Sequence, residues 1–146
     1  MPGVASAPCA GLWWGDARVF FVKLVWGLDR CVVMREHGGV AMWFRTYSED
    51  EDVWQYFEDG GDGWATRQVD LRGADGRPLT AASLDEVLRA RDGGDRAAMR
   101  LYEQQFGVLA ETVLDGWRDA PRAEEILQVE IEQVWVRARG ALGASA

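Results

Sequence analysis

Residues 53–71 read VWQYFEDGGDGWATRQVDL and carry the clearest structural signal in the 146-residue chain. Two segments rich in aromatic and β-branched residues flank residues 59–63, whose three glycines allow the positive φ angles of a tight turn. The pattern predicts two antiparallel strands, at 53–58 and 64–71. Because side chains alternate along a strand, the odd positions of the second strand, Arg67 included, are expected to face a core, and the even positions to face solvent or a site.

A third strand and a second turn extend this hairpin into a meander. Residues 42–47, MWFRTY, are rich in aromatic side chains and predict a strand, which the polar residues 48–52 connect to the strand at 53. The glycines and the proline in 73–78 predict the next turn. Short connections favour antiparallel neighbours, so the three strands are expected to form a small antiparallel sheet.

Three helices are expected after the sheet. Ser83 and Glu86 have the spacing of a capping box, which predicts a helix that the glycines at 93–94 end. Asp95 is placed to cap a second helix, which ends at Gly107. The fold class expected is α+β, a small antiparallel β-meander packed against two or three helices. The last helix has one apolar face, formed by Ile131, Val134, Trp135 and Ala138.

The charge and the sequence pattern change at residue 42. Residues 1–41 carry four basic and three acidic side chains, whereas residues 42–146 carry 12 and 21, which together give the net charge of −8. The His-Gly-Gly at 37–39 can be encoded by CAC-GGA-GGC, which contains the bacterial ribosome-binding core GGAGG. We therefore expect residues 1–41 to be an extension from a mis-called start at Met1, with translation beginning at Met42 and 42–146 forming a single domain. The alternative is a genuine N-terminal strand pair or helix.

The same boundary decides which chemistry is open to the protein. The only histidine, His37, both cysteines, Cys9 and Cys31, and the single lysine, Lys23, all precede Met42. A chain that starts at Met42 lacks the commonest general base, the thiol nucleophile, the Schiff-base amine and the standard zinc ligands. We therefore predict no catalytic residues, no cofactor and no metal site.

Composition disfavours two classes of partner. A net charge of −8 argues against nucleic acid and anionic membranes, both of which bind through patches rich in Lys and Arg. The apolar run at 19–28 is too short for a membrane-spanning helix and lacks the flanks of a signal peptide. We expect a cytoplasmic protein, and the sequence predicts no particular oligomeric state.

Seven residues are candidates for binding a partner. Exposed aromatic side chains on a sheet mark protein interfaces, and an arginine that faces a core needs a carboxylate or a ligand. The acidic stretch 50–62 contains no basic residue and suits a basic partner or a divalent cation. The structural alternatives are solvated loops, tryptophans covered by helices, and a salt bridge or a different strand register for Arg67. The candidates are Trp43, Trp54, Tyr56, Trp64, Arg67, Asp59 and Asp62.

Four motifs after residue 42 form a recognisable series. They are W-x-x-R-x-V-D at 64–70, S-L-x-E-V-L at 83–88, E-E-I at 124–126 and V-W-x-x-A-R at 134–139. From about residue 42 to 140 the chain resembles a group of small actinobacterial proteins without an established activity. Similar proteins carry Ser or Thr after E-E-I, where this chain has Leu and Gln. The resemblance implies the fold and a start near the MWFR strand, but no activity.

Two functions from different classes stay open. The first is a non-enzymatic, acidic module of regulatory or immunity type, which binds a basic protein partner through its acidic edge and aromatic sheet. The second is a small-molecule pocket, binding or enzymatic, built from Arg67, Asp70 and the tryptophans. A flat acidic and aromatic face favours the first function, and a closed, deep pocket around Arg67 favours the second.

Overall fold

The computed structural model describes residues 20–22, 32–34 and 39–144. The first two segments, β1 (Phe20–Val22) and β2 (Val32–Met34), pair antiparallel as a separate two-stranded sheet. The start at Met42 and the division of the chain there stay predictions. Five residues named above lie outside the described ranges: Met1, Cys9, Lys23, Cys31 and His37.

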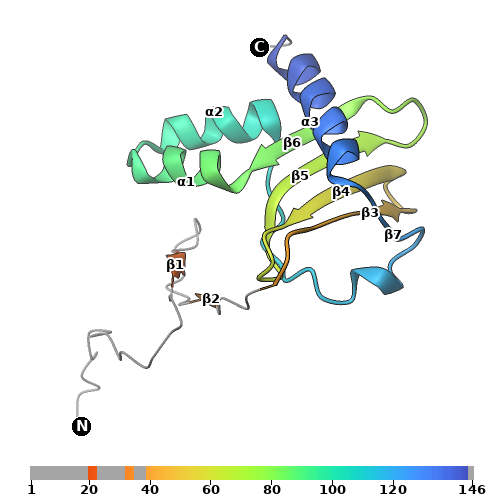
Figure 1. The fold of residues 1–146 in the computed structure, drawn as a ribbon. Coiled ribbons are helices and arrows are strands. Elements are labelled where there is room, and N and C mark those ends of the chain that lie inside the picture. Colours follow the sequence, from red (N-terminus) through yellow and green to blue (C-terminus); the bar gives the residue numbers. More distant parts are fainter. Residues whose placement is uncertain (1–19, 23–31, 35–38, 145–146) are drawn as a thin grey trace, which may run out of the picture.

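Five strands form the main sheet, and every neighbouring pair is antiparallel. The order in the sheet is β6-β5-β4-β3-β7 (Figure 1). The strands β3, β4 and β5 match the three predicted strands to within one residue at each end, which confirms the α+β meander. The strands are β3 (Met42–Ser48), β4 (Val53–Asp59), β5 (Ala65–Arg72), β6 (Pro78–Ser83) and β7 (Glu124–Glu125).

Two of these strands were not predicted from the sequence. β6 follows the turn directly, and its sequence PLTAAS has no aromatic residue and only one β-branched residue, Thr80, to mark a strand. β7 has only two residues, and it is a strand because it pairs with Phe44 and Arg45 of β3. Ile126 N–H then donates to the Trp43 carbonyl at 2.9 Å, so the chain after β7 continues along the edge of β3.

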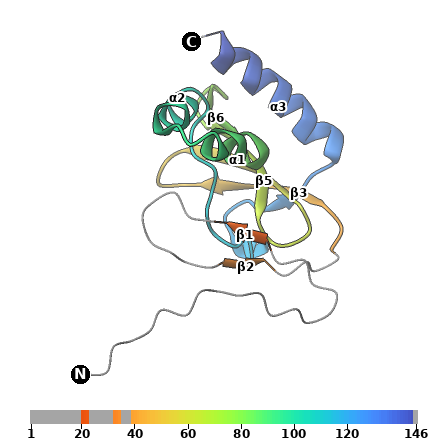
Figure 2. The same ribbon diagram turned by 90° about the vertical axis from the view of Figure 1, so that its left-hand side faces the viewer.

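Three α-helices follow the strands of the meander, as predicted (Figure 1). They are α1 (Leu84–Asp92), α2 (Arg96–Phe106) and α3 (Gln128–Gly143). Asp95 caps α2 by accepting a backbone hydrogen bond at 2.7 Å, and Gly107 ends that helix with a φ of 83°. The helices α1 and α2 pack side by side next to β6 (Figure 2). None of the helices within 39–144 has the length and apolar character to cross a membrane.

The capping box predicted at Ser83 and Glu86 does not form. α1 does begin after Ser83, but Ser83 is also the last residue of β6, and its hydroxyl makes no capping hydrogen bond. Its backbone N–H donates to the Tyr102 hydroxyl at 2.8 Å, and that hydroxyl donates to Oε2 of Glu86 at 2.8 Å. Arg139 of α3 pairs with the same Glu86 carboxylate. These side chains therefore join three helices instead of capping one.

The two faces of the sheet carry separate apolar clusters. On one face α3 packs across β6, β5 and β4, with Ile131 and Ala138 fully buried against the sheet. On the opposite face the irregular segment after α2 covers the sheet, and its Trp117 ring stacks on Phe44 at 4.2 Å. The 3-10 turn η1 (Trp117–Asp119) lies in that segment. The sheet is therefore enclosed on both sides, which limits where a binding site can lie.

Gln68 corrects the expectation that the even positions of the third predicted strand face water or a site. Its side chain is only 5% exposed, because the segment after α2 crosses it. The Ala110 N–H donates to Gln68 Oε1 at 2.8 Å, and Gln68 Nε2 donates to the Asp70 carboxylate at 3.0 Å. No local pattern in the strand indicates that an irregular segment, rather than solvent, lies over this face.

Candidate functional site

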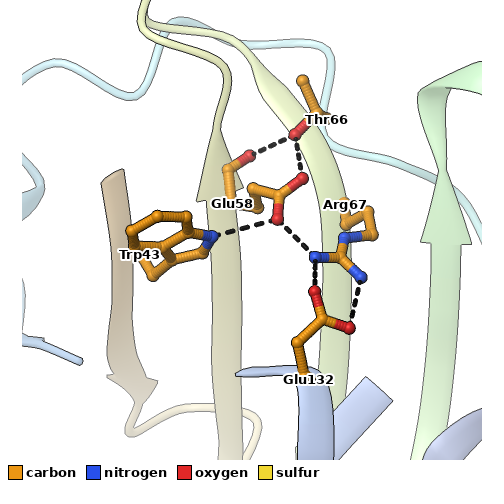
Figure 3. Close-up of polar contacts among 5 residues, drawn as sticks. All are labelled: Trp43, Glu58, Thr66, Arg67 and Glu132. Atoms are coloured by element: carbon orange, nitrogen blue, oxygen red, sulfur yellow. Dashed lines mark hydrogen bonds and ion pairs between the residues drawn. The ribbon is translucent and has the colours of Figure 1, made fainter. Parts of the chain in front are cut away.

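Arg67 faces the inside of the fold, as its position in the strand pattern predicted. On β5 it lies opposite Glu58 of β4, and its guanidinium points toward α3 (Figure 3). Its Nη2 is 2.5 Å from Oε2 of Glu58 and 2.5 Å from Oε1 of Glu132 on α3, and its Nη1 is 3.2 Å from Oε2 of Glu132. The carboxylates that an inward arginine requires are therefore Glu58 and Glu132.

Further donors complete the coordination of Glu58 (Figure 3). The Trp43 indole N–H donates to Oε2 at 3.0 Å, and the Thr66 hydroxyl lies 2.8 Å from Oε1. The register between β4 and β5 shifts after Glu58, which is a β-bulge of the kind that redirects side chains. Every buried polar side-chain atom in the described residues has a hydrogen-bond partner.

The electrostatics of this network keep all three groups charged. Hydrogen bonds to Glu132 and Glu58 raise the pKa of Arg67, against the opposing effect of burial. Burial alone would raise the pKa of Glu58, but the bonds from Arg67, Trp43 and Thr66 outweigh it and hold that pKa below its usual value. The bond from Arg67 likewise lowers the pKa of Glu132. Two carboxylates share one guanidinium, so the network offers no unneutralised positive charge to an anionic ligand.

Asp70 does not join Arg67. It lies on the opposite face of β5, where both of its oxygens accept from Gln68 Nε2 and its backbone N–H donates to the Thr80 hydroxyl at 3.1 Å. Burial, with only neutral donors nearby, raises the pKa of the Asp70 carboxyl. The structure therefore does not bring together the two charged residues named for a small-molecule pocket.

The aromatic candidates divide into two places. Trp43, Trp54 and Tyr56 share the α3 face of the sheet, with Tyr56 buried and both tryptophans half-buried against the apolar cluster. Trp64 stands apart, in the turn before β5, and is also half-buried. Three of the four residues therefore share one face of the sheet, and α3 covers part of that face.

Asp59 and Asp62 organise the turn between β4 and β5. Asp59 Oδ1 accepts from the N–H groups of Gly61 and Gly63 at 2.7 and 3.0 Å, and Asp62 Oδ1 accepts from the Trp64 N–H at 3.0 Å. These are bonds within the turn of the kind that aspartate commonly makes. Across the described ranges, no three His, Cys, Asp or Glu residues are grouped closely enough to hold a metal ion.

The structure reveals a second cluster that the sequence did not predict. Tyr47 and Trp54 lie opposite each other near the turn between β3 and β4, with ring centroids 5.0 Å apart at an angle of 56°. The Arg122 guanidinium lies 4.3 Å from the Tyr47 ring centroid and 5.9 Å from that of Trp54, and Arg45 lies 4.9 Å from Trp54. We call Arg45, Tyr47, Trp54 and Arg122 the β3–β4 aromatic cluster.

Acidic residues surround the β3–β4 aromatic cluster. Asp52 accepts a short hydrogen bond from the Tyr47 hydroxyl, and Glu124 Oε2 accepts from Arg45 Nε at 2.9 Å. The turn between β3 and β4 exposes three consecutive carboxylates in residues 49–51. Only Trp54 was named from the sequence, because the approach of Arg122 depends on a loop that lies far away along the chain.

Comparison with protein-family models, with curated proteins and with solved structures found no match.

Proposed function

We propose that the protein is a non-enzymatic, cytoplasmic module of regulatory or immunity type, which binds a basic protein partner at the β3–β4 end of the sheet. The observation that carries this proposal is the β3–β4 aromatic cluster with its rim of carboxylates. Trp, Tyr and Arg dominate the binding energy of protein interfaces. A rim of one charge selects a partner of the opposite charge and accelerates association.

The charge of the whole domain agrees with such a partner. Residues 42–146 carry 12 basic and 21 acidic side chains, and five of the acidic ones, at 49–52 and 124, lie beside the cluster. An excess of negative charge disfavours nucleic acid and anionic membranes as partners. A basic protein surface is the complementary match.

The charged side chains elsewhere are engaged in holding the fold. Arg67 is bound by two carboxylates, Asp59 and Asp62 close the turn, and Asp70 is bonded to Gln68. Residues 42–146 also contain no His, Cys or Lys. These features favour binding over catalysis, because residues 42–146 lack the commonest general base, the thiol nucleophile and the Schiff-base amine.

A charge-reversal experiment tests the proposal. Full-length protein would be immobilised and used to capture its partner from an extract of its own host, and the affinity of the captured partner would then be measured. The variant Glu49→Lys/Asp50→Lys changes two exposed residues of the β3–β4 turn. The control Glu111→Lys/Asp115→Lys makes the same charge change at exposed positions in the segment over the opposite face.

We expect the first variant to bind the partner about tenfold more weakly, or about 1.4 kcal/mol, and the control to bind nearly as the unmodified protein does. The captured partner should be basic, and its binding should weaken as the salt concentration rises. An equal effect of both variants, or a captured partner with an acidic surface, contradicts the proposal.

A further inference from the structure

The Tyr47–Trp54 pair already holds a cation from its own chain. Arg122 enters from the loop between η1 and β7, and its guanidinium lies over the Tyr47 ring at 4.3 Å. The neighbouring Arg45 lies over Trp54 at 4.9 Å. Contacts of this kind within about 6 Å of a ring centroid are attractive. The aromatic pair is therefore a surface suited to a guanidinium, whichever chain supplies it.

The two arginines are held very differently. Arg45 donates to Glu124 at 2.9 and 2.5 Å and to the Tyr56 hydroxyl at 3.4 Å, which fixes its guanidinium in place. Arg122 is exposed, and none of the ion pairs among residues 39–144 includes it. Its contact with the rings is therefore the more readily exchanged of the two.

Backbone strain also converges on Tyr47. Within the described part of the chain, only Asp52 and Arg122 have a positive φ without being glycine, at 52° and 51°. Asp52 accepts the hydrogen bond from the Tyr47 hydroxyl, and Arg122 covers the Tyr47 ring. For most side chains this backbone conformation is unfavourable by about 1–2 kcal/mol per residue, and aspartate adopts it more readily than arginine does. Strained residues gather where a site is prepared for a ligand.

We propose that Arg122 is an internal stand-in for an arginine of the basic partner. In the complex the partner's guanidinium lies on Tyr47 and Trp54 in place of Arg122, and neighbouring basic residues of the partner pair with the carboxylates at 49–51. This inference rests on the proposed function and specifies what the partner presents, which is an exposed arginine in a basic segment. Because Arg122 occupies the rings in the free protein, that protein is partly self-blocked until the partner displaces Arg122.

Arginine fits this place better than lysine. The guanidinium is planar and weakly hydrated, so it stacks on an aromatic face, whereas the ammonium group is compact and strongly hydrated. The carboxylate of Asp52 is engaged by the Tyr47 hydroxyl, so it fixes the ring that receives the cation. Arg122 does not pair with the exposed carboxylates at 49–51, so these carboxylates can attract the basic side chains of the partner.

The test uses a defined probe, a synthetic peptide in which three arginines alternate with glycine, and the full-length protein labelled with 5-fluorotryptophan. The Trp54→Phe variant identifies the fluorine resonance of Trp54 among the eight tryptophans. The binding constant is taken from the shift of that resonance. Matched peptides with lysine or glutamate in place of arginine serve as controls.

The decisive variant is Arg122→Gln, compared with Arg118→Gln. Arg118 is also exposed, stacks on the Trp117 ring at 4.5 Å, and lies four residues earlier, so both variants change the net charge equally. Removing the internal competitor should let Arg122→Gln bind the arginine peptide about fivefold more tightly than Arg118→Gln does. The lysine peptide should gain less, and the glutamate peptide should not bind.

Two results overturn the inference. An equal gain in Arg118→Gln and Arg122→Gln shows that only the net charge matters. A Trp54 resonance that the arginine peptide fails to move in Arg122→Gln shows that the rings do not receive a guanidinium. Neither result depends on the natural partner, so a failure here is distinguishable from a failure of the charge-reversal experiment on the captured protein.

Discussion

Among the arginines that lie over aromatic rings in this protein, Arg67 and Arg122 have guanidinium groups in different surroundings. Arg67 lies 5.3 Å from the Trp135 ring centroid, is bound by Glu58 and Glu132, and has a side chain only 18% exposed. Arg122 lies 4.3 Å from the Tyr47 ring centroid and is exposed to solvent. A guanidinium that lies over an aromatic ring is therefore enclosed at Arg67 and open to solvent at Arg122.

The difference shows how to separate a structural arginine from a binding one. Around Arg67 the carboxylates come from β4 and α3, so the ion pairs fix how α3 lies on the sheet. Around Arg122 the carboxylates face the solvent, and the guanidinium contacts only rings. Removing an enclosed cation leaves charges buried, whereas removing an open one leaves a surface that another cation can take.

The substitution expected to change the stability of the fold most is Arg67→Met. This change leaves Glu58 and Glu132 without their cation, and breaking a buried ion pair usually costs about 3–5 kcal/mol. Because the Glu132 side chain is 45% exposed, solvent reduces this, and we expect a loss of about 2–3 kcal/mol in the free energy of unfolding. Urea denaturation at pH 7 measures it.

Arg89→Met is the matched control for that loss. Arg89 pairs with Asp85 across one turn of α1, and both side chains are more than 70% exposed, at 73% and 85%. Such pairs contribute less than about 0.5 kcal/mol. If Arg67→Met lowers the free energy of unfolding no more than Arg89→Met does, the enclosed network does not stabilise the fold, and Arg67 does not differ from an exposed arginine such as Arg122.

The stability of Arg67→Met should also depend on pH differently from that of the unmodified protein. The pKa values of Glu58 and Glu132 lie below the ordinary 4.5, so the stabilisation by Arg67 is complete above pH 4.5 and is lost as the pH falls through the lowered values. The gap in unfolding free energy between the unmodified protein and Arg67→Met should therefore be constant near neutral pH and shrink in acid. A gap that is unchanged down to pH 2 would rule out the ion pairs as its source.

Asp70 is a buried carboxyl that no guanidinium neutralises. Its effect on the free energy of unfolding should therefore change with pH in the opposite direction to that of Glu58 and Glu132. Burial raises its pKa above 3.8, so ionising it within the fold lowers stability as the pH rises through that higher value. Asp70→Asn never ionises and keeps a hydrogen bond from Gln68. The variant should be more stable than the unmodified protein at pH 7, and the advantage should vanish below pH 3.8 in chemical denaturation.

Asp75→Asn is the control for Asp70→Asn. The Arg72 guanidinium lowers the pKa of exposed Asp75 to about 2, so its loss should lower stability slightly at pH 7 instead of raising it. Equal signs for the two variants would show that the environment of Asp70 has been misread.

The smallest expected effect on stability is that of Arg122→Gln. An exposed cation–π contact contributes about 0.5–1 kcal/mol, and glutamine keeps part of the packing on the Tyr47 ring. We expect thermal and urea denaturation to show a change of less than about 0.5 kcal/mol. A loss as large as that of Arg67→Met would make Arg122 a structural residue and would contradict its role as a stand-in.

The sequence predicted the hairpin at 53–71 because its glycine-rich turn and its alternating strands agree with each other. It also predicted that Arg67 faces inward and that Asp70 does not, since side chains alternate along a strand. It did not predict β6, because the two buried alanines of that strand, Ala81 and Ala82, owe their position to packing against helices and sheet. Local pattern therefore described the hairpin well and the edges of the sheet poorly.

The β3–β4 aromatic cluster also could not be predicted from local sequence, because it depends on contacts between distant parts of the chain. Tyr47 and Trp54 are brought opposite each other by the strand register, which a sequence reading can follow. Arg122 reaches them because the Pro121 carbonyl accepts the Tyr47 N–H at 2.9 Å and β7 pairs with β3. Those contacts join residues more than seventy positions apart in the sequence, and no local pattern specifies them.

The most direct test compares partner affinity and thermal stability in Glu49→Lys/Asp50→Lys and in Glu132→Gln. Glu132→Gln weakens the enclosed network, so it should lower the melting temperature and leave the affinity for the captured partner unchanged. Glu49→Lys/Asp50→Lys should weaken that affinity about tenfold and leave the melting temperature nearly unchanged. If Glu132→Gln instead abolishes partner binding while the charge reversal at the β3–β4 turn does not, the binding site lies at Arg67 and the proposal is wrong.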